Sequence, residues 1–262
     1  MSTKLPKREL RVLICEDNAI NQMFAKEVCR RAGIEVVISE NGQVGIETLQ
    51  QDTDFDAIFM DCHMPIMDGF EASRKIRELV NEGSLPKIPV IALTANAVAG
   101  DREKCVAAGM DDYLTKPFEI QDFLEIIHTN TTVTPDPATE SKANASDDSG
   151  EPIFNLEKLL SQIDDRVFAL DIANQFAASL PRYKKDLEEC LDQQDAELVF
   201  TVSHRLKGTA STVKADRISS IATEIESASR DGQLDDLQSQ VAELLQEFEN
   251  FSNVIREEIA IG

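Results

Sequence analysis

The sequence has no long apolar run. No uninterrupted stretch approaches the roughly 20 residues that a helix needs to span a bilayer. The first residues, MSTKLPKREL, also lack the apolar core of a signal peptide. We therefore expect a cytoplasmic protein that has no membrane-spanning segment and no membrane partner.

Cysteines are few and have no paired spacing. The five are Cys15, Cys29, Cys62, Cys105 and Cys190. A disulfide framework or a zinc site is recognised by closely spaced or conserved pairs, so this scatter disfavours both. Scattered thiols are typical of a reducing compartment.

Basic residues are scarce relative to acidic ones. The chain has 26 Lys and Arg against 48 Asp and Glu, a formal net charge of −22 at pH 7. Such a charge disfavours attraction to phosphate backbones. We therefore expect no nucleic-acid partner, and most of the acids are expected to form a solvated surface.

Short apolar runs in the first half each stop at a polar residue. The runs end at Glu16-Asp17, Asp61, Thr94 and Lys116. A further run, Val36–Ile38, precedes a short helix-like stretch. Runs of this length that alternate with helix-like stretches indicate buried parallel strands. The pattern predicts an α/β doubly wound domain with a five-stranded parallel sheet.

The second half has a different pattern. Residues 131–152, TTVTPDPATESKANASDDSGEP, contain one bulky aliphatic residue and three prolines. That composition predicts a flexible linker with a span of roughly 25 Å. Beyond it, apolar residues recur at helical spacing, which predicts an all-α antiparallel helical bundle. We therefore divide the chain into domains at 9–130 and 153–262, with the linker at 131–152.

The strand ends of the first domain predict a reactive pocket. Ligands of open α/β sheets bind beyond the carboxyl ends of the strands. Glu16, Asp17 and Asp61 would repel one another there, and a hard divalent ion such as Mg²⁺ would relieve that repulsion. Lys116 and Thr94 could then neutralise and hydrogen-bond a phosphoryl group, with Asp61 as the carboxylate nucleophile.

These residues resemble the motifs of response-regulator receiver domains, which have a flavodoxin-like fold. The matching segments are ICEDN, FMDCHMPIMDG, ALTAN and YLTKPF, and the ALTANA and CHMP segments look most like receivers attached to hybrid sensor kinases. The resemblance implies phosphorylation of Asp61. It also implies Mg²⁺ held directly by Asp17 and Asp61, by Glu16 through water, and by the backbone carbonyl of His63, with Thr94 and Tyr113 as a switch pair.

The side chain of His63 has two interpretations. It lies two residues after Asp61, where it could act as a metal ligand or proton donor and alter the lifetime of an aspartyl phosphate. The commoner case is a residue at the pocket rim that only faces solvent.

A second histidine lies in the bundle half, on a helix expected from about Asp195 to about Thr212. His204 is predicted to face away from the apolar side of this helix. The residues expected to share its face are Phe200, Lys207, Gly208 and Ser211. Lys207 would supply positive charge for a phosphoryl group. Gly208 costs about 1 kcal/mol in a helix relative to alanine, which close approach of a docking partner would offset.

The segment SHRLKGTA resembles the signature of histidine-phosphotransfer domains, and STVKA and EIE continue the match. The resemblance implies a bundle in which an exposed His204 carries phosphate without ATP chemistry of its own. One position departs from the family pattern. Lys214 stands where glycine is typical, so the shape of the chain after Val213 is left open.

Together these features predict a phosphorelay intermediate. It would pass a phosphoryl group between Asp61 and His204, linking an upstream histidine kinase to a downstream response regulator. The two domains could also meet in cis, at an effective concentration on the order of millimolar. The main alternative is a phosphorylation-controlled binding switch or a phosphate sink that regulates another kinase and regulator pair, which would use the same residues.

Two enzyme classes fit less well. An autonomous kinase would be expected to have an acidic residue directly after its histidine and a nearby proline, but Arg205 follows His204. No Gly-rich nucleotide-binding segment is evident either. A haloacid-dehalogenase-type phosphatase would place a second aspartate where this chain has His63.

Overall fold

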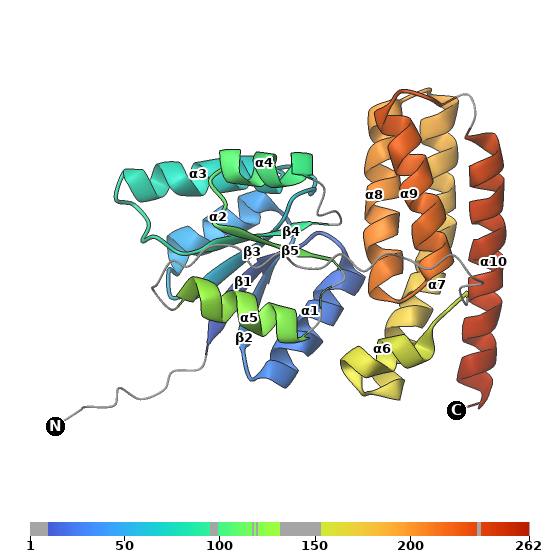
Figure 1. Ribbon diagram of the computed structural model, residues 1–262, viewed down its shortest axis with the longest axis horizontal. Helices are drawn as coiled ribbons and strands as arrows, with labels where there is room; N and C mark the ends of the chain where they lie inside the picture. The colour runs from blue at the N-terminus through green and yellow to red at the C-terminus, as the bar shows by residue number, and fades with distance from the viewer. Residues whose placement is uncertain are drawn as a thin grey trace. The chain divides into compact units, whose positions relative to one another are not determined.

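The computed structural model describes residues 10–94, 99–116, 118, 120–131, 153–234 and 237–261. The chain divides into two compact units, Met1–Ala143 and Asn144–Gly262 (Figure 1). The linker predicted at 131–152 lies outside the described residues, apart from Thr131. Its flexibility and the boundaries at 130 and 153 therefore stay predictions.

The first unit contains the predicted five-stranded parallel sheet, in the order β2-β1-β3-β4-β5. Its strands are β1 (Arg11–Cys15), β2 (Glu35–Ser39), β3 (Ala57–Asp61), β4 (Val90–Thr94) and β5 (Asp112–Thr115). The strand order reverses between β1 and β3. In doubly wound sheets this reversal opens a crevice at the carboxyl ends of the two strands.

Helices cover both faces of this sheet (Figure 1). They are α1 (Ala19–Ala32), α2 (Gly42–Gln51), α3 (Gly69–Asn81), α4 (Ala99–Ala107) and α5 (Ile120–Thr131). On one face Leu13 and Ile58 join a core cluster with Ile76 of α3. On the other, the ring of Phe59 stacks on that of Phe123 of α5, with centroids 4.4 Å apart. Alternation along the buried strands therefore supplies two apolar layers.

Local sequence signals fix where α1 begins and ends. The side chain of Asn18 accepts hydrogen bonds from the backbone of Ile20 and Asn21, which caps the first turn. Gly33 ends the helix in the left-handed conformation, at φ 67°. Because Asn18 follows Glu16 and Asp17 directly, this cap also fixes the chain that leaves β1.

The second unit is helical, as predicted. Its helices are α6 (Leu156–Ile163), α7 (Arg166–Asp192), α8 (Ala196–Thr212), α9 (Asp216–Arg230) and α10 (Gln238–Ile261). Pro181 lies inside α7, and apolar residues at helical spacing on both sides of it belong to this one helix. Proline removes one helical hydrogen bond, but the flanking apolar residues are buried, including Phe176, whose ring meets that of Phe251 of α10 at 5.3 Å.

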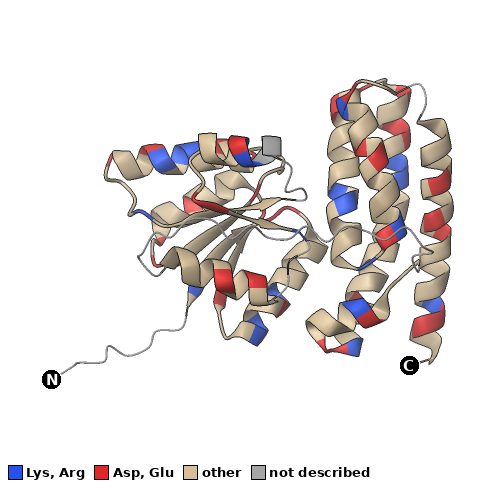
Figure 2. Ribbon diagram, viewed as in Figure 1, with Lys and Arg blue, Asp and Glu red and all other residues tan. Residues whose placement is uncertain are grey.

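No helix among the described residues combines the length and apolarity needed to cross a membrane. Asp and Glu are spread over helices of both units (Figure 2).

Gly69 tests how tightly the start of α3 is packed. A Cβ built on Gly69 would overlap the backbone carbonyl of Asp61, and Gly69 N donates to Cys62 O at 3.1 Å. We expect Gly69→Ala to lower the free energy of unfolding of the first unit by about 1–3 kcal/mol, as overpacking does. Hydrogen exchange of the β3 amides would measure this.

Gly208→Ala is the contrasting variant. A Cβ built on Gly208 would meet no described atom within 4 Å beyond its own stretch of helix. This substitution should therefore raise the stability of the second unit by up to about 1 kcal/mol, since alanine favours helix. Equal hydrogen-exchange protection of the β3 amides in Gly69→Ala and in the unchanged chain would contradict the packing argument for Gly69.

Candidate phosphoacceptor sites

Three carboxylates gather at the carboxyl edge of the sheet. Glu16 and Asp17 follow β1, and Asp61 ends β3. The two strands pair in register, with Cys15 opposite Met60, so the residues after them reach the same edge. One oxygen from each carboxylate lies within 4.8 Å of the others. The structure thus brings together the acidic residues that the sequence singled out.

Lys116 joins two of these carboxylates. Its Nζ donates to Asp61 Oδ2 at 2.6 Å and also to Glu16 Oε2. Burial is the largest influence on Glu16 and raises its pKa to about 7, although Lys116 opposes this rise. Burial also disfavours the charged ammonium, but Asp61 and Glu16 outweigh it and raise the pKa of Lys116. The ammonium is therefore held charged inside an acidic cluster.

Thr94 and Tyr113 lie on the two neighbouring strands. Thr94 ends β4 and is buried, and its carbonyl accepts a hydrogen bond from the backbone amide of Lys116 at 2.7 Å. Tyr113 lies on β5 opposite Ala92 and packs partly buried against the core cluster. The structure thus places Thr94 beside the Lys116 segment, while the switch role of Thr94 and Tyr113 stays a prediction.

His63 uses its backbone and its ring differently. Its backbone amide donates to Asp61 Oδ1 at 3.2 Å. Its ring lies edge-on to Phe70 of α3, with centroids 5.9 Å apart. The ring therefore packs toward α3, a placement that the sequence did not suggest.

The donor set fits a hard divalent cation. It consists of carboxylate oxygens from Glu16, Asp17 and Asp61, which Mg²⁺ prefers over nitrogen or sulfur ligands. The one ammonium of Lys116 lies among three carboxyl groups, so the cluster has more acidic groups than basic ones even when Glu16 is protonated, and a metal would neutralise the remaining negative charge.

The second site is built around Glu226 of α9. His204 Nδ1 lies 3.0 Å from Glu226 Oε1, and Lys207 Nζ donates to Glu226 Oε2 at 2.8 Å. Burial alone would raise the pKa of Glu226, but the hydrogen bonds from His204 and Lys207 lower it to about 2. An ionised carboxylate only accepts hydrogen bonds, so Nδ1 carries a proton, and in the neutral form of the ring Nε2 keeps the lone pair.

Two expectations about α8 need correction. His204 was predicted to be exposed, but only 12% of its side chain is accessible, because Glu226 and the stacked ring of Phe200, 5.8 Å away, cover it. Lys207 was expected on the same open face. It is buried, since its stem packs inside and its ammonium binds Glu226.

Glu226 and Arg230 were not recognised from the sequence. Glu226 falls next to the apolar stripe of α9, so an acid at a buried position was the available signal. Arg230 lies one turn further, with its guanidinium carbon 5.2 Å from the centre of the Phe200 ring and a nitrogen 3.5 Å from Glu226 Oε1.

The end of α8 explains the unusual position of Lys214. Its φ is +60°, and the hydrogen bonds Ala215 N to Ala210 O (2.9 Å) and Lys214 N to Ser211 O (3.2 Å) form a Schellman motif. Glycine suits the left-handed position of this motif best. The shape left open by the sequence is thus an ordinary helix end that carries lysine instead of glycine.

Ser211 is half-buried, and its hydroxyl lies 2.6 Å from that of Ser219.

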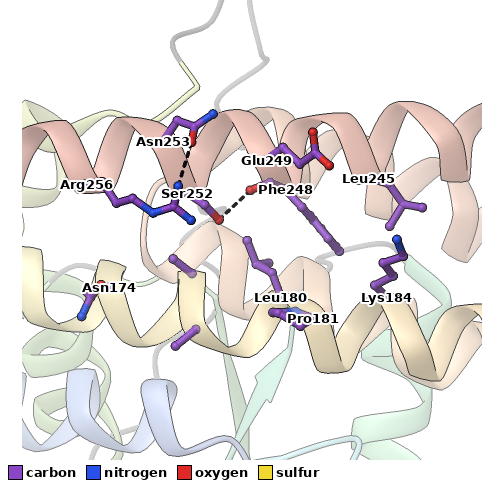
Figure 3. A pocket seen from close by; sticks show the side chains of 12 residues that line it. Asn174, Leu180, Pro181, Lys184, Leu245, Phe248, Glu249, Ser252, Asn253 and Arg256 are labelled. Atoms are coloured by element: carbon purple, nitrogen blue, oxygen red, sulfur yellow. Dashed lines mark hydrogen bonds between the residues drawn. The ribbon is translucent and has the colours of Figure 1, made fainter.

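A groove of about 640 Å³ lies elsewhere on the second unit, between α7 and α10 (Figure 3). Leu180 and Phe248 face its middle, and Lys184 and Arg256 lie toward opposite ends. None of the predicted site residues lines it.

Comparison with protein families matches both halves. Residues 12–128 match the response regulator receiver domain, and residues 171–254 match the Hpt domain. The chain therefore contains a response regulator receiver domain followed by an Hpt domain. This pair of domains indicates phosphorelay signalling in a two-component system.

Curated relatives are similar to this chain over part of their own length. The chain is 31% identical to the sensor protein GacS of Pseudomonas syringae pv. syringae over 78% of its own residues, which is 23% of GacS. It is 26% identical to the aerobic respiration control sensor protein ArcB of Escherichia coli over 98% of its residues, which is 32% of ArcB. The chain thus spans less than two thirds of these relatives.

Two solved structures are similar to this chain. One is the receiver domain of the sensor histidine kinase PA1611 from Pseudomonas aeruginosa, crystallised with a magnesium ion in its active-site cleft. It is 38% identical, covers 47% of this chain and 98% of its own, and has a TM-score of 0.43. The other contains the Saccharomyces cerevisiae phosphotransfer protein Ypd1 with the receiver domain of Ssk1. It is 30% identical, the match covers 47% of this chain and 89% of the other, and the TM-score is 0.44.

The depressed pKa of Glu226 predicts a specific pH dependence. A carboxyl with a pKa of about 2 when folded, against an ordinary 4.5, stabilises the fold above pH 4.5 and loses that effect as the pH falls toward 2. We expect Glu226→Gln to lower the free energy of unfolding by about 2–3 kcal/mol at pH 6. The deficit should shrink between pH 4.5 and pH 2.

Glu224→Gln is the matched control, because Glu224 lies on the same helix but is exposed. Urea unfolding of the helical unit at several pH values measures both variants. A deficit in Glu226→Gln that does not change with pH would contradict the role of this ionised carboxylate.

Proposed function

We propose that this protein passes a phosphoryl group between Asp61 and His204, and so connects an upstream histidine kinase with a downstream response regulator. One observation carries the proposal. Each candidate acceptor lies in a cluster suited to it, with Lys116 beside Asp61 and Glu226 orienting His204. The transfer could occur within one molecule or between two.

The imidazole would act through its outer nitrogen. With the Nδ1 proton held by Glu226, Nε2 supplies an electron pair to the phosphorus of an aspartyl phosphate. The O–P bond of that donor breaks, its electron pair stays on the carboxylate, and the ring becomes positively charged. The carboxylate of Glu226 stabilises that charge. In the transfer to Asp61 the Nε2–P bond breaks and its electrons return to the ring, so the histidine leaves as neutral imidazole with its Nδ1 proton in place.

The carboxylate would complete the step at the sheet edge. An oxygen of Asp61 forms the new O–P bond as the phosphoryl group arrives. Lys116 supplies an ammonium at 2.6 Å from Asp61 Oδ2. From this position it can bind the phosphoryl oxygens and stabilise their negative charge. The Thr94 hydroxyl offers a hydrogen bond from the neighbouring strand. The reverse transfer uses the same groups.

Mg²⁺ is part of the proposal. Asp17 and Asp61 would hold it directly, Glu16 through water, and His63 through its carbonyl. When bound, Mg²⁺ would neutralise the carboxylates and the transferring phosphoryl oxygens. The carboxylate cluster supports this assignment.

Phosphate transfer between full-length variants tests the proposal. A histidine kinase that labels the unchanged chain with radioactive phosphate should label both domains. Asp61→Ala should reduce labelling of His204 by this route to background, and His204→Ala should reduce onward transfer to a response regulator to background. Asp54→Ala and His128→Ala are controls, since both residues are exposed. Normal onward transfer by both site variants would refute the relay. Labelled Asp61 without exchange to His204 would indicate the switch or sink.

Metal binding is a separate prediction. We expect Asp17→Asn and Asp61→Asn each to weaken Mg²⁺ binding by about tenfold or more, because loss of a direct ligand should cost at least as much as loss of an outer partner. Calorimetric titration of the full chain with MgCl₂ would measure the affinity, with Asp54→Asn as the control. Unchanged affinity in both site variants would contradict this ligand set.

A further inference from the structure

Glu16 is the most deeply buried carboxylate of the receiver cluster. Only 2% of it is exposed, so the protein itself must supply most of its hydrogen-bond donors. Lys116 donates to one oxygen, Oε2. The other oxygen, Oε1, accepts two hydrogen bonds, and both donors lie at the start of α1. The transfer chemistry proposed above makes no use of these two bonds.

The two donors to Oε1 are the backbone amide of Asn18 and the side-chain amide of Asn21, each 3.1 Å away. An ionised carboxylate only accepts hydrogen bonds, so the Asn21 atom that faces it is the nitrogen Nδ2. An amide has no net charge. Asn21 therefore satisfies a buried carboxylate oxygen without adding a second cation that would compete with a metal ion.

The first turn of α1 holds Asn21 in place. The side chain of Asn18 caps this turn and accepts a hydrogen bond from the backbone amide of Asn21 at 3.3 Å. On the next residue, Gln22 Nε2 donates to the backbone carbonyl of Glu16 at 2.6 Å. The start of α1 thus binds both the backbone and the carboxylate of Glu16. A side chain supported in this way has a defined orientation.

The bonds to Oε1 determine where Oε2 lies. Because Oε1 is bound to α1, the carboxylate cannot rotate freely, and Oε2 stays on the side of Lys116. The same ammonium donates to Asp61 Oδ2 at 2.6 Å, so Oε2 is held beside the acceptor aspartate. Outer partners that orient the groups around a metal are typically worth about 10–100-fold in metal affinity.

We propose that Asn21 is a positioning residue of the receiver site, which holds the Glu16 carboxylate in the orientation that Mg²⁺ binding at Asp17 and Asp61 requires. This inference rests on the proposed function and adds a residue to it. Asn21 lies outside the segment ICEDN from which the site was predicted. It contacts neither the metal nor the phosphoryl group, and it acts only through Glu16.

A double-mutant cycle on Mg²⁺ binding tests the proposal. The unchanged full chain, Asn21→Ala, Glu16→Gln and the double variant are each titrated with MgCl₂ in a calorimeter. We expect Asn21→Ala to weaken binding about tenfold, the lower end of the effect of losing an outer partner. Because Asn21 acts through Glu16, the double variant should bind within about twofold of Glu16→Gln alone.

Two further variants separate positioning from folding. Asn21→Leu keeps a side chain of similar size but has no donor, so it should weaken binding as Asn21→Ala does. Alanine and leucine both favour helix more than asparagine does, and urea unfolding would check that α1 is intact. Gln43→Ala is the matched control. It removes the bond from Gln43 Nε2 to Glu47 Oε1 (2.8 Å), an amide-to-carboxylate bond on α2 outside the cluster, and should leave Mg²⁺ affinity unchanged.

The outcomes are distinct. An affinity within about twofold of the unchanged chain in both Asn21 variants would overturn the positioning role. Losses that multiply in the double variant would also overturn it, because Asn21 would then act independently of Glu16. If the unchanged chain binds no Mg²⁺, the metal part of the proposed function fails and the role of Asn21 with it. If Mg²⁺ binds as expected but Asp61 and His204 exchange no phosphate, only the relay is refuted.

Discussion

The ion pairs of Lys116 are the interaction on which the receiver site depends. Three carboxylates at one sheet edge would repel one another, and burial of Glu16 and Asp61 increases the cost of their charge. The ammonium between Glu16 and Asp61 offsets part of this cost, so the acids remain close together in the folded chain. It leaves excess negative charge, which favours a divalent cation. The same ammonium lies where a transferred phosphoryl group would need positive charge.

The Hpt domain uses the opposite arrangement. There a single carboxylate, Glu226, lies among His204, Lys207 and Arg230. The receiver cluster is suited to gaining a cation and a phosphoryl group, while the Hpt cluster keeps an imidazole in one tautomer and compensates its charge. The receiver cluster therefore has more carboxylates than nitrogen bases, and the Hpt cluster has more nitrogen bases than carboxylates. This complementarity agrees with the phosphorelay signalling that the two families indicate.

Part of this was predictable from the sequence, for a physical reason. The carboxyl ends of parallel strands lie at the same edge of a sheet. Polar residues that follow buried strands are therefore expected to lie close together, as Asp61, Lys116 and Thr94 do. The bundle was harder. Helical periodicity places His204 on a face but does not reveal that Glu226 from another helix covers it. It also does not show that Pro181 lies inside a continuous helix or that Ile66 adopts a positive φ. These features depend on contacts between elements and on backbone geometry.

A crystal structure of the full chain with Mg²⁺ and beryllofluoride would test the central claim most directly. Beryllofluoride bonds to an aspartate oxygen and mimics an aspartyl phosphate. Our account predicts that it bonds to Asp61 alone, with Lys116 Nζ and the Thr94 hydroxyl on its fluorines and Mg²⁺ held by Asp17 and Asp61. An unmodified Asp61 at saturating ligand, or an adduct on another carboxylate, would contradict the account.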